Sequence, residues 1–411
     1  MLAPFRVKSF RFQWPSDLLT SWAFEMETLI LGWYVLVETG SVTMLTLFGA
    51  LQFVGTLLSP LIGMLGDRLG HRNVLCCMRA IYALLATLLM AIAFAGVLTS
   101  SIVLVIWGLQ GLVRPSDLAV RQTLVAETMP PEQLMGGMGL TRTTSDLSRI
   151  GGALAGAGMF KAYGIGNAYV MIVACYLAGL FLSLMVKPRL MRAAGGTEPG
   201  TKRPSPWRDL REGLSYVWSQ PHMLAGMWLA FLVNLTAFPL SGGLLPYVAR
   251  DIYQMGPTGL GLLVASFASG AFLGSIWLTV WGGPFPLGRM AMALAFVWYA
   301  LLLGFSQMGS AFAGCAFLIV AGFAQSLSMV PLAVMLLRTS DTQFRGRVMG
   351  VRMLAIYSLP IGLIVAGELI KRVGFHTTAF AYALTGLALT AAILFKWRGS
   401  IWSPQAVANR R

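Results

Sequence analysis

The sequence predicts an all-α membrane protein with twelve transmembrane helices arranged as two six-helix bundles. Of the 411 residues, 57% are hydrophobic and only 11% are charged, and long apolar runs recur along the whole chain. A soluble globular chain carries roughly a quarter charged residues, so a soluble fold could not hide this much apolar surface. The 46 glycines suit helices that pack closely in a bilayer.

A spanning helix needs about 20 mostly apolar residues, and twelve such stretches can be marked. In the first half they are residues 18–37, 44–65, 74–95, 102–120, 136–160 and 167–186. In the second half they are residues 223–248, 259–281, 290–308, 312–337, 348–368 and 378–395. We therefore expect an N-terminal bundle over 1–186, a linker over 187–222 and a C-terminal bundle over 223–411.

The linker is the one long polar stretch between these runs, and it is rich in lysine and arginine. Its latter part, residues 207–218, is predicted to form an amphipathic helix that lies on the membrane surface. Its basic residues are Lys187, Arg189, Arg192, Lys202, Arg203, Arg208 and Arg211.

The distribution of lysine and arginine over the loops predicts the orientation of the chain. On the side of the two tails and the linker we count 22 basic residues, Arg79 and Arg121 included, and on the other side four. Since cytoplasmic loops carry the excess of lysine and arginine, both tails and the linker are predicted to be cytoplasmic. Residues 1–15 are interpreted as a retained tail, and the membrane is predicted to be the inner, cytoplasmic one.

Several function classes are excluded by composition. The net charge of +15 is spread over short loops and forms no basic face or domain, so nucleic acid is not an expected partner. The four cysteines lie in apolar stretches without metal-ligand spacing, and the three histidines are scattered, so no metal or cofactor is expected. No phosphate-binding loop of an ATP-driven pump is present, and we do not expect an enzyme.

One loop carries a specific motif. Residues 63–72 read GMLGDRLGHR and follow the second predicted span. They resemble the G-x-x-x-D-R-x-G-x-R signature of the major facilitator superfamily, matched at Gly63, Asp67, Arg68, Gly70 and Arg72. Glycines permit a tight turn and the acid can pair with arginines or a helix terminus. The resemblance implies a gate on the cytoplasmic side and a two-bundle transporter fold.

Further runs resemble the branch of that superfamily that contains enterobactin exporters and macrolide efflux pumps. They are residues 111–115, 124–125, 130–134, 149–156, 210–218 and 345–350. Three features depart from the usual drug/proton antiporter pattern. Trp107 replaces a basic residue three positions before Gln110, Gly151-Gly152 replaces a glycine-proline pair, and the loop over 282–289 lacks the acid of the motif.

Ionisable residues inside spanning helices are functional candidates, because burying them costs several kcal/mol unless they are paired or hydrated. At about 100° per residue, Arg142, Asp146 and Arg149 share one stripe of the fifth span. Arg114, Asp117 and Arg121 likewise share one stripe of the fourth span. Glu25 and Glu27 are about 200° apart, so only one of them can face a central cavity. The candidates of the first half are Glu25, Glu27, Arg114, Asp117, Arg142, Asp146 and Arg149.

Depth along the helices predicts a cluster of Glu25, Asp146 and Arg149 that couples transport to protons, with Arg142 and Arg114 in the same cavity. Asp117 and Arg121 are assigned to support of the cytoplasmic gate. A purely structural salt-bridge network is the alternative. The second half is predicted to form an adaptable apolar wall of methionine and aromatic side chains.

The resulting hypothesis is a secondary exporter, an antiporter for protons and a small amphipathic or anionic molecule such as a siderophore or a drug. Its expected partners are that substrate, protons and the lipid bilayer, and it is expected to be a monomer. An uptake carrier or uniporter of the same fold remains open, as does a receptor or scaffold that does not transport.

Overall fold

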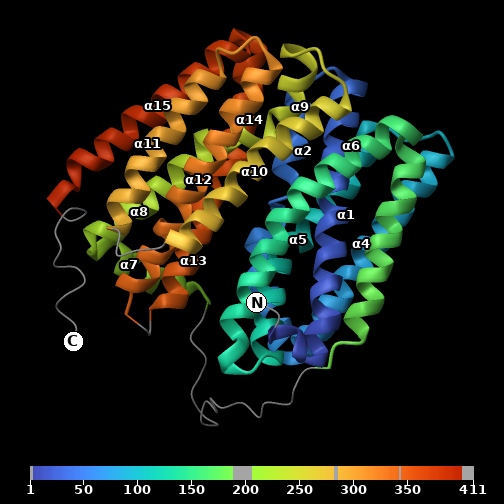
Figure 1. Ribbon diagram of the computed structural model, residues 1–411, viewed down its shortest axis with the longest axis horizontal. Coiled ribbons are helices and arrows are strands. Elements are labelled where there is room, and N and C mark those ends of the chain that lie inside the picture. Colours follow the sequence, from blue (N-terminus) through green and yellow to red (C-terminus); the bar gives the residue numbers. More distant parts are fainter. Residues whose placement is uncertain (1–2, 188–205, 282–285, 342–343, 400–411) are drawn as a thin grey trace. The chain divides into compact units, whose positions relative to one another are not determined.

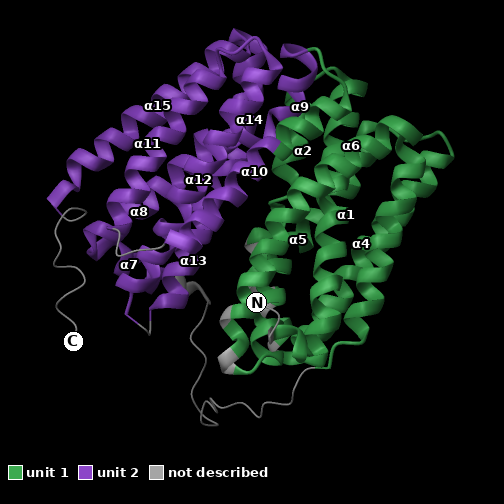
Figure 2. Ribbon diagram, in the orientation of Figure 1, with its two compact units in different colours: residues 1–202, 254–265 green, residues 203–253, 266–411 purple. Residues whose placement is uncertain are grey.

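The computed structural model describes residues 3–187, 206–281, 286–341 and 344–399. These residues form helices joined by short connections, and no strand occurs among them (Figure 1). The chain divides into two compact units (Figure 2). Unit 1 comprises residues 1–202 and 254–265, and unit 2 comprises residues 203–253 and 266–411.

Unit 1 contains the helices α1 to α6 and the start of α10. The helices α1, α4, α5 and α6 pack side by side (Figure 1). A 3-10 turn, Ala3–Arg6, precedes α1, and another, Val54–Leu58, separates α2 from α3. The helices are α1 (Lys8–Thr39), α2 (Val42–Leu51), α3 (Ser59–Leu69), α4 (His71–Phe94), α5 (Ser100–Thr128) and α6 (Pro131–Leu184).

Two glycines with positive φ shape this unit. Gly164, with φ of 78°, kinks α6 into two spans, 131–163 and 165–184. Gly70, with φ of 86°, turns the chain between α3 and α4. Side chains with a Cβ rarely adopt this conformation, so the tight turn predicted in the motif loop is confirmed at Gly70.

Unit 2 starts with the helix that ends the linker, α7 (Pro206–Ser219), which confirms the helix predicted over 207–218. Three π-helical segments, Val233–Ala237, Pro239–Gly243 and Val248–Ile252, lie between α8 and α10. Residues 257–265, at the start of α10, group with unit 1. The other helices are α8 (Pro221–Leu232), α9 (Leu245–Tyr247), α10 (Pro257–Trp281), α11 (Leu287–Phe305), α12 (Ala311–Thr339), α13 (Arg345–Ile356), α14 (Ser358–Val373) and α15 (Phe375–Lys396).

Twelve spans follow from these helices, as predicted. Nine helical stretches of the described chain are long and apolar enough to cross a bilayer. One of them is α6, which the kink at Gly164 makes into two spans. The remaining two spans are α1, which carries Glu25 and Glu27, and the pair of α2 and α3, which a 3-10 turn separates.

The helices α1 and α6 approach each other closely near the buried charges of unit 1. Gly152 and Gly156 are four residues apart on α6, and a Cβ at Gly156 would lie 2.9 Å from Cα of Met26. A Cβ at Gly152 would lie 2.8 Å from Cβ of Glu25. Small residues at this spacing let membrane helices approach closely, and both glycines serve this contact.

Candidate functional site

The buried charges of the described chain all lie in unit 1. Burying an ionisable group in a spanning segment is costly, so these residues mark the candidate site. They form three groups, which differ in whether each charge has a partner of opposite sign. The buried charged residues are Asp17, Glu27, Arg79, Asp117, Arg121 and Asp146.

The first group is centred on Arg79 of α4, which is 0% exposed. Its Nη2 bonds to Oδ1 of Asp17, and its Nη1 contacts the hydroxyls of Ser16 and Ser183. Nη1 also donates to the carbonyl oxygen of Gly179 at 3.3 Å. The loop position predicted for Arg79 is wrong, because α4 begins at His71 and carries Arg79 into the bundle.

A second ion pair extends this group. Nη2 of Arg121 lies 2.5 Å from Oδ2 of Asp117, and its Nε lies 3.7 Å from Oδ1 of Asp17. Nη1 of Arg121 donates to Oγ of Ser21 at 2.7 Å. Asp17 therefore faces two arginines, and the four formal charges cancel. We call Asp17, Arg79, Asp117 and Arg121 the charge tetrad.

The second group surrounds Glu27 of α1, which is 0% exposed. Its Oε1 accepts hydrogen bonds from Nε2 of Gln110 and from the hydroxyl of Tyr169, each at 3.1 Å. Its Oε2 accepts one from the hydroxyl of Tyr176 at 2.8 Å. The ring of Tyr82 lies 5.7 Å from that of Tyr176. Three neutral donors from two other helices therefore hold this carboxyl group.

An arginine and aromatic rings lie beside this second group. The guanidinium group of Arg114 stacks over the ring of Phe24 and lies 5.6 Å from the ring of Trp107. Glu25 lies close enough to Arg114 to interact with it electrostatically. Nη1 of Arg114 is buried without a hydrogen-bond partner. Trp107 in turn donates its Nε1 hydrogen to the carbonyl oxygen of Phe48 at 3.0 Å.

The third group lies on α6. Oδ2 of the buried Asp146 lies 3.6 Å from Nε of Arg142, whose side chain is 65% exposed. Arg149 is the other cation that acts on Asp146. Among the described residues, no hydrogen bond or ion pair joins Glu25 to Asp146 or Arg149. The structure thus places Glu25 with Arg114 and Asp146 with its helix neighbours.

The motif loop lies where α3 ends and α4 begins. Gly63 lies in α3, as does Asp67, whose side chain is outside the described part of the structure. Arg68 is exposed, and Arg72 donates to the carbonyl oxygen of Leu184. This contact ties the start of α4 to the end of α6.

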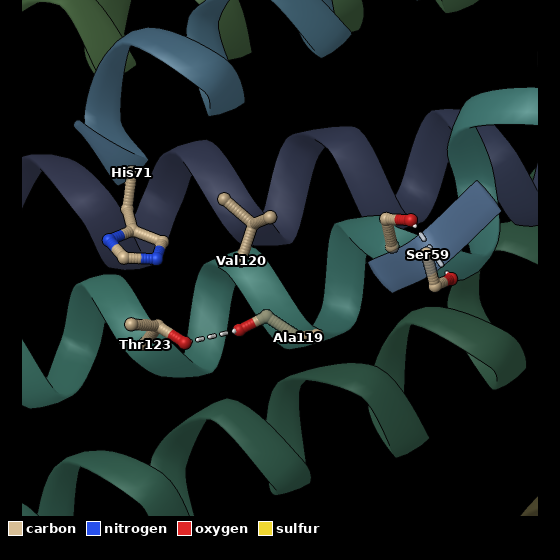
Figure 3. A pocket seen from close by; sticks show the side chains of 6 residues that line it. Ser59, His71, Ala119, Val120 and Thr123 are labelled. Carbon is tan, nitrogen blue, oxygen red and sulfur yellow. Dashed lines mark hydrogen bonds between the residues drawn. The ribbon is translucent and has the colours of Figure 1, made fainter. Parts of the chain in front are cut away.

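Next to the loop lies a small cavity of about 60 Å³, into which Figure 3 looks. Its wall includes His71, whose Nδ1 lies 2.7 Å from Oε1 of Glu127. Ser116 and Ser59, also in the wall, are joined by a hydrogen bond of 3.0 Å between their hydroxyls. The remaining lining residues are Ala119, Val120 and Thr123.

Three features of the site were missed or left undecided by the sequence. Asp17 lies just before the predicted first span, and the two tyrosines stand in an apolar run where a hydroxyl gives little signal. Their spacing could have indicated a site, since Tyr169 and Tyr176 are seven residues apart and so share one helix face. The choice between Glu25 and Glu27 was open, because the sequence does not show which face of α1 turns inward.

Comparison with known proteins identifies relatives over most of the chain. A sequence model of the Major Facilitator Superfamily matches residues 16–361. The multidrug efflux pump Tap of Mycobacterium tuberculosis is 26% identical over 379 residues, which cover 86% of this chain and 84% of that protein. Macrolide efflux protein A of Streptococcus pyogenes is 21% identical over 280 residues, covering 66% of this chain and 67% of that protein.

Solved structures share the fold. A bacterial homologue of the human lysosomal transporter Spinster, in an inward-facing and unoccupied conformation, gives a TM-score of 0.71 at 13% identity. The match covers 98% of this chain and 99% of that one. A D-xylose-proton symporter also gives 0.71 at 13% identity, over 97% of this chain and 98% of that chain. At such low identity, these matches support the fold alone.

Proposed function

This chain belongs to the Major Facilitator Superfamily of transporters, and on that basis we propose that it is a proton-coupled secondary exporter. Its substrate is a small amphipathic or anionic molecule, such as a siderophore or a drug. It works in the cytoplasmic membrane as a monomer, with both termini in the cytoplasm. The efflux function of the two curated relatives supports export over uptake.

The observation that carries the proposal is the concentration of buried charge in unit 1. A buried acid changes its charge when it takes up a proton, and an arginine in the same unit can bind the acidic part of a solute. Both kinds of residue occur within α1, α5 and α6. A carrier built only to diffuse a neutral solute would have no use for these costly groups.

Residues of the site receive separate roles in this mechanism. Glu25 and Asp146 exchange protons, and Arg114, Arg142 and Arg149 attract the acidic part of the substrate. For Arg114, the unbonded Nη1 is available to an anion, while the rings of Phe24 and Trp107 offer an apolar face to an amphipathic solute.

The gate of the transporter lies at the end of unit 1 that carries the motif loop. Asp117 and Arg121, as an ion pair in α5, support this loop. The other members of the gate are Gly63, Asp67, Arg68, Gly70 and Arg72.

Transport into inside-out vesicles tests the proposal, with erythromycin and ethidium as probes and an imposed pH gradient as the driving force. The wild type should accumulate at least one probe, whereas Glu25→Gln and Asp146→Asn should lose gradient-driven uptake while still inserting in the membrane. Glu38→Gln, an exposed acid at the far end of α1, is the matched control. Full gradient-driven transport by both variants would refute their coupling role.

The direction of transport is tested with the same probes in vesicles of the opposite orientation. Uptake of the same probes by right-side-out vesicles, with none by inside-out vesicles, would refute export.

A further inference from the structure

Glu27 differs from the other fully buried charges of unit 1 in having no cation as a direct partner. Among the described residues, its hydrogen bonds come from Gln110, Tyr169 and Tyr176, all of them neutral. Arg114 on α5 acts on Glu27 only through space. Ionised, the group is thus a single negative charge in a buried site, whereas the charge tetrad is neutral as a whole.

The same donors make the ionised form tolerable. A carboxylate offers about four lone-pair positions and can accept several hydrogen bonds, and bonds to a charged acceptor are stronger than bonds between neutral groups. Two phenols and one amide satisfy both carboxylate oxygens. Glu27 therefore need not be protonated to be buried.

The protonated, neutral form of Glu27 can also form a hydrogen bond in this site. A protonated carboxyl group is a donor and needs an acceptor, and Oε1 of Gln110 is buried without a hydrogen-bond partner. Rotation of the Gln110 amide exchanges its nitrogen and oxygen with almost no change in shape. After rotation, Oε1 can accept the new hydrogen bond from Glu27, so a group left unsatisfied in one state is satisfied in the other.

We propose that Glu27 is a proton-exchange site of this transporter, and that Gln110, Tyr169 and Tyr176 are positioning residues that hold it in both protonation states. The inference rests on the proposed function, because it assigns a further residue to proton coupling. In each cycle a proton from water binds one carboxylate oxygen, forming an O–H bond and a neutral acid. The same bond breaks when the proton leaves to water, and the carboxylate returns.

The location of the site connects it to the residues assigned to the substrate. Gln110 and Arg114 are four residues apart on α5 and therefore share a face of the helix. The side chain that responds to the proton thus lies one turn from the guanidinium group assigned to the solute. Tyr82, whose buried hydroxyl has no hydrogen-bond partner, extends the polar site toward α4.

Infrared difference spectroscopy of the purified protein between low and high pH tests the site without a substrate. The wild type should show a carboxylic acid C=O band that Glu27→Gln loses and that Glu38→Gln retains. Tyr176→Phe removes one donor from the carboxylate, so the midpoint of this band should move upward by about one pH unit. An unchanged spectrum in Glu27→Gln overturns the proposal. If Glu27→Gln does not fold, an unchanged midpoint in Tyr176→Phe overturns it instead.

Transport separates this inference from the proposed function. With erythromycin or ethidium, Glu27→Gln should lose accumulation driven by a pH gradient but keep exchange of labelled for unlabelled probe, which needs no proton. Gradient-driven accumulation by Glu27→Gln at the wild-type level would overturn the inference alone. A wild type that transports neither probe would instead refute the proposed function, while the infrared band would still decide whether Glu27 exchanges protons.

Discussion

The two units bury polar groups in different ways. Unit 1 buries six charged side chains, whereas every buried polar residue in the described part of unit 2 is a serine, a threonine or Asn234. Hydroxyl groups can bond to the carbonyl of the preceding helical turn, as Thr236 does to Leu232, and so need no partner helix. The buried Asp17, Glu27 and Arg79 instead take their partners from other helices, so the position of one helix affects the others in unit 1 more strongly than in unit 2.

Unit 2 has a different irregularity, in its backbone. The span Pro221–Ile252 contains the three π-helical segments, and Pro239 opens the second of them. Nδ2 of Asn234 donates to the carbonyl oxygen of Ala230 within this span. Such segments are rare and often occur at functional sites. The two units thus differ in kind: unit 1 contains the buried charges, which the proposed function uses for proton coupling, and unit 2 contains the irregular backbone.

The largest expected effect comes from breaking the charge tetrad. Arg79→Met removes the main partner of the buried Asp17 and should cost about 3–5 kcal/mol. The melting temperature of the purified protein should fall steeply, and the double variant Asp17→Leu with Arg79→Met should recover much of it. Arg372→Ala, in an exposed pair with Glu368, should leave the melting temperature unchanged. Equal losses in the single and double variants would show that the pairing is not what stabilises this region.

An intermediate effect is expected at the contact of α1 and α6. Gly156→Ala places a methyl group against the backbone of Met26 and should cost about 1–3 kcal/mol, because the neighbouring helix must shift. Gly158→Ala on the same helix is the matched control, since a Cβ there meets no atom within 4 Å. Thermal unfolding of both variants measures the difference. Equal melting temperatures would contradict the close packing.

The smallest effect is expected in unit 2, where α7 is attached to the segment before α13. The hydroxyl of Tyr216 donates to Oδ2 of Asp341 at 3.1 Å, and its ring stacks on Phe344 at 4.4 Å. The same hydroxyl accepts a hydrogen bond from the backbone N–H of Asp341 at 3.2 Å. Tyr216→Phe keeps the stacking and loses both hydrogen bonds, at a cost of about 0.5–1.5 kcal/mol each.

Hydrogen exchange along α7 measures this local loosening. It should rise in Tyr216→Phe and remain at the wild-type rate in Ser215→Ala, a change at the exposed neighbouring residue. Unchanged exchange in Tyr216→Phe would contradict this prediction and leave other contacts, such as the Glu212–Arg347 pair at 3.0 Å, to hold α7.

The sequence by itself determined the number and order of the spans, the glycine turn of the motif loop and the helix at the end of the linker. These features depend on local properties: a run of about 20 apolar residues, a glycine that tolerates positive φ, and an amphipathic repeat. Gly152 and Gly156 were also recognisable, because their four-residue spacing is the property that lets helices approach.

Only the tertiary structure decided which charges are buried and with what. Helical periodicity separated Glu25 from Glu27 without showing which of them faces the other helices, and positive charge near a helix end concealed the burial of Arg79. The donors to Glu27 are 83 to 149 residues away in the chain. A side chain's partners come from helices brought beside it by packing, and no local pattern contains that information.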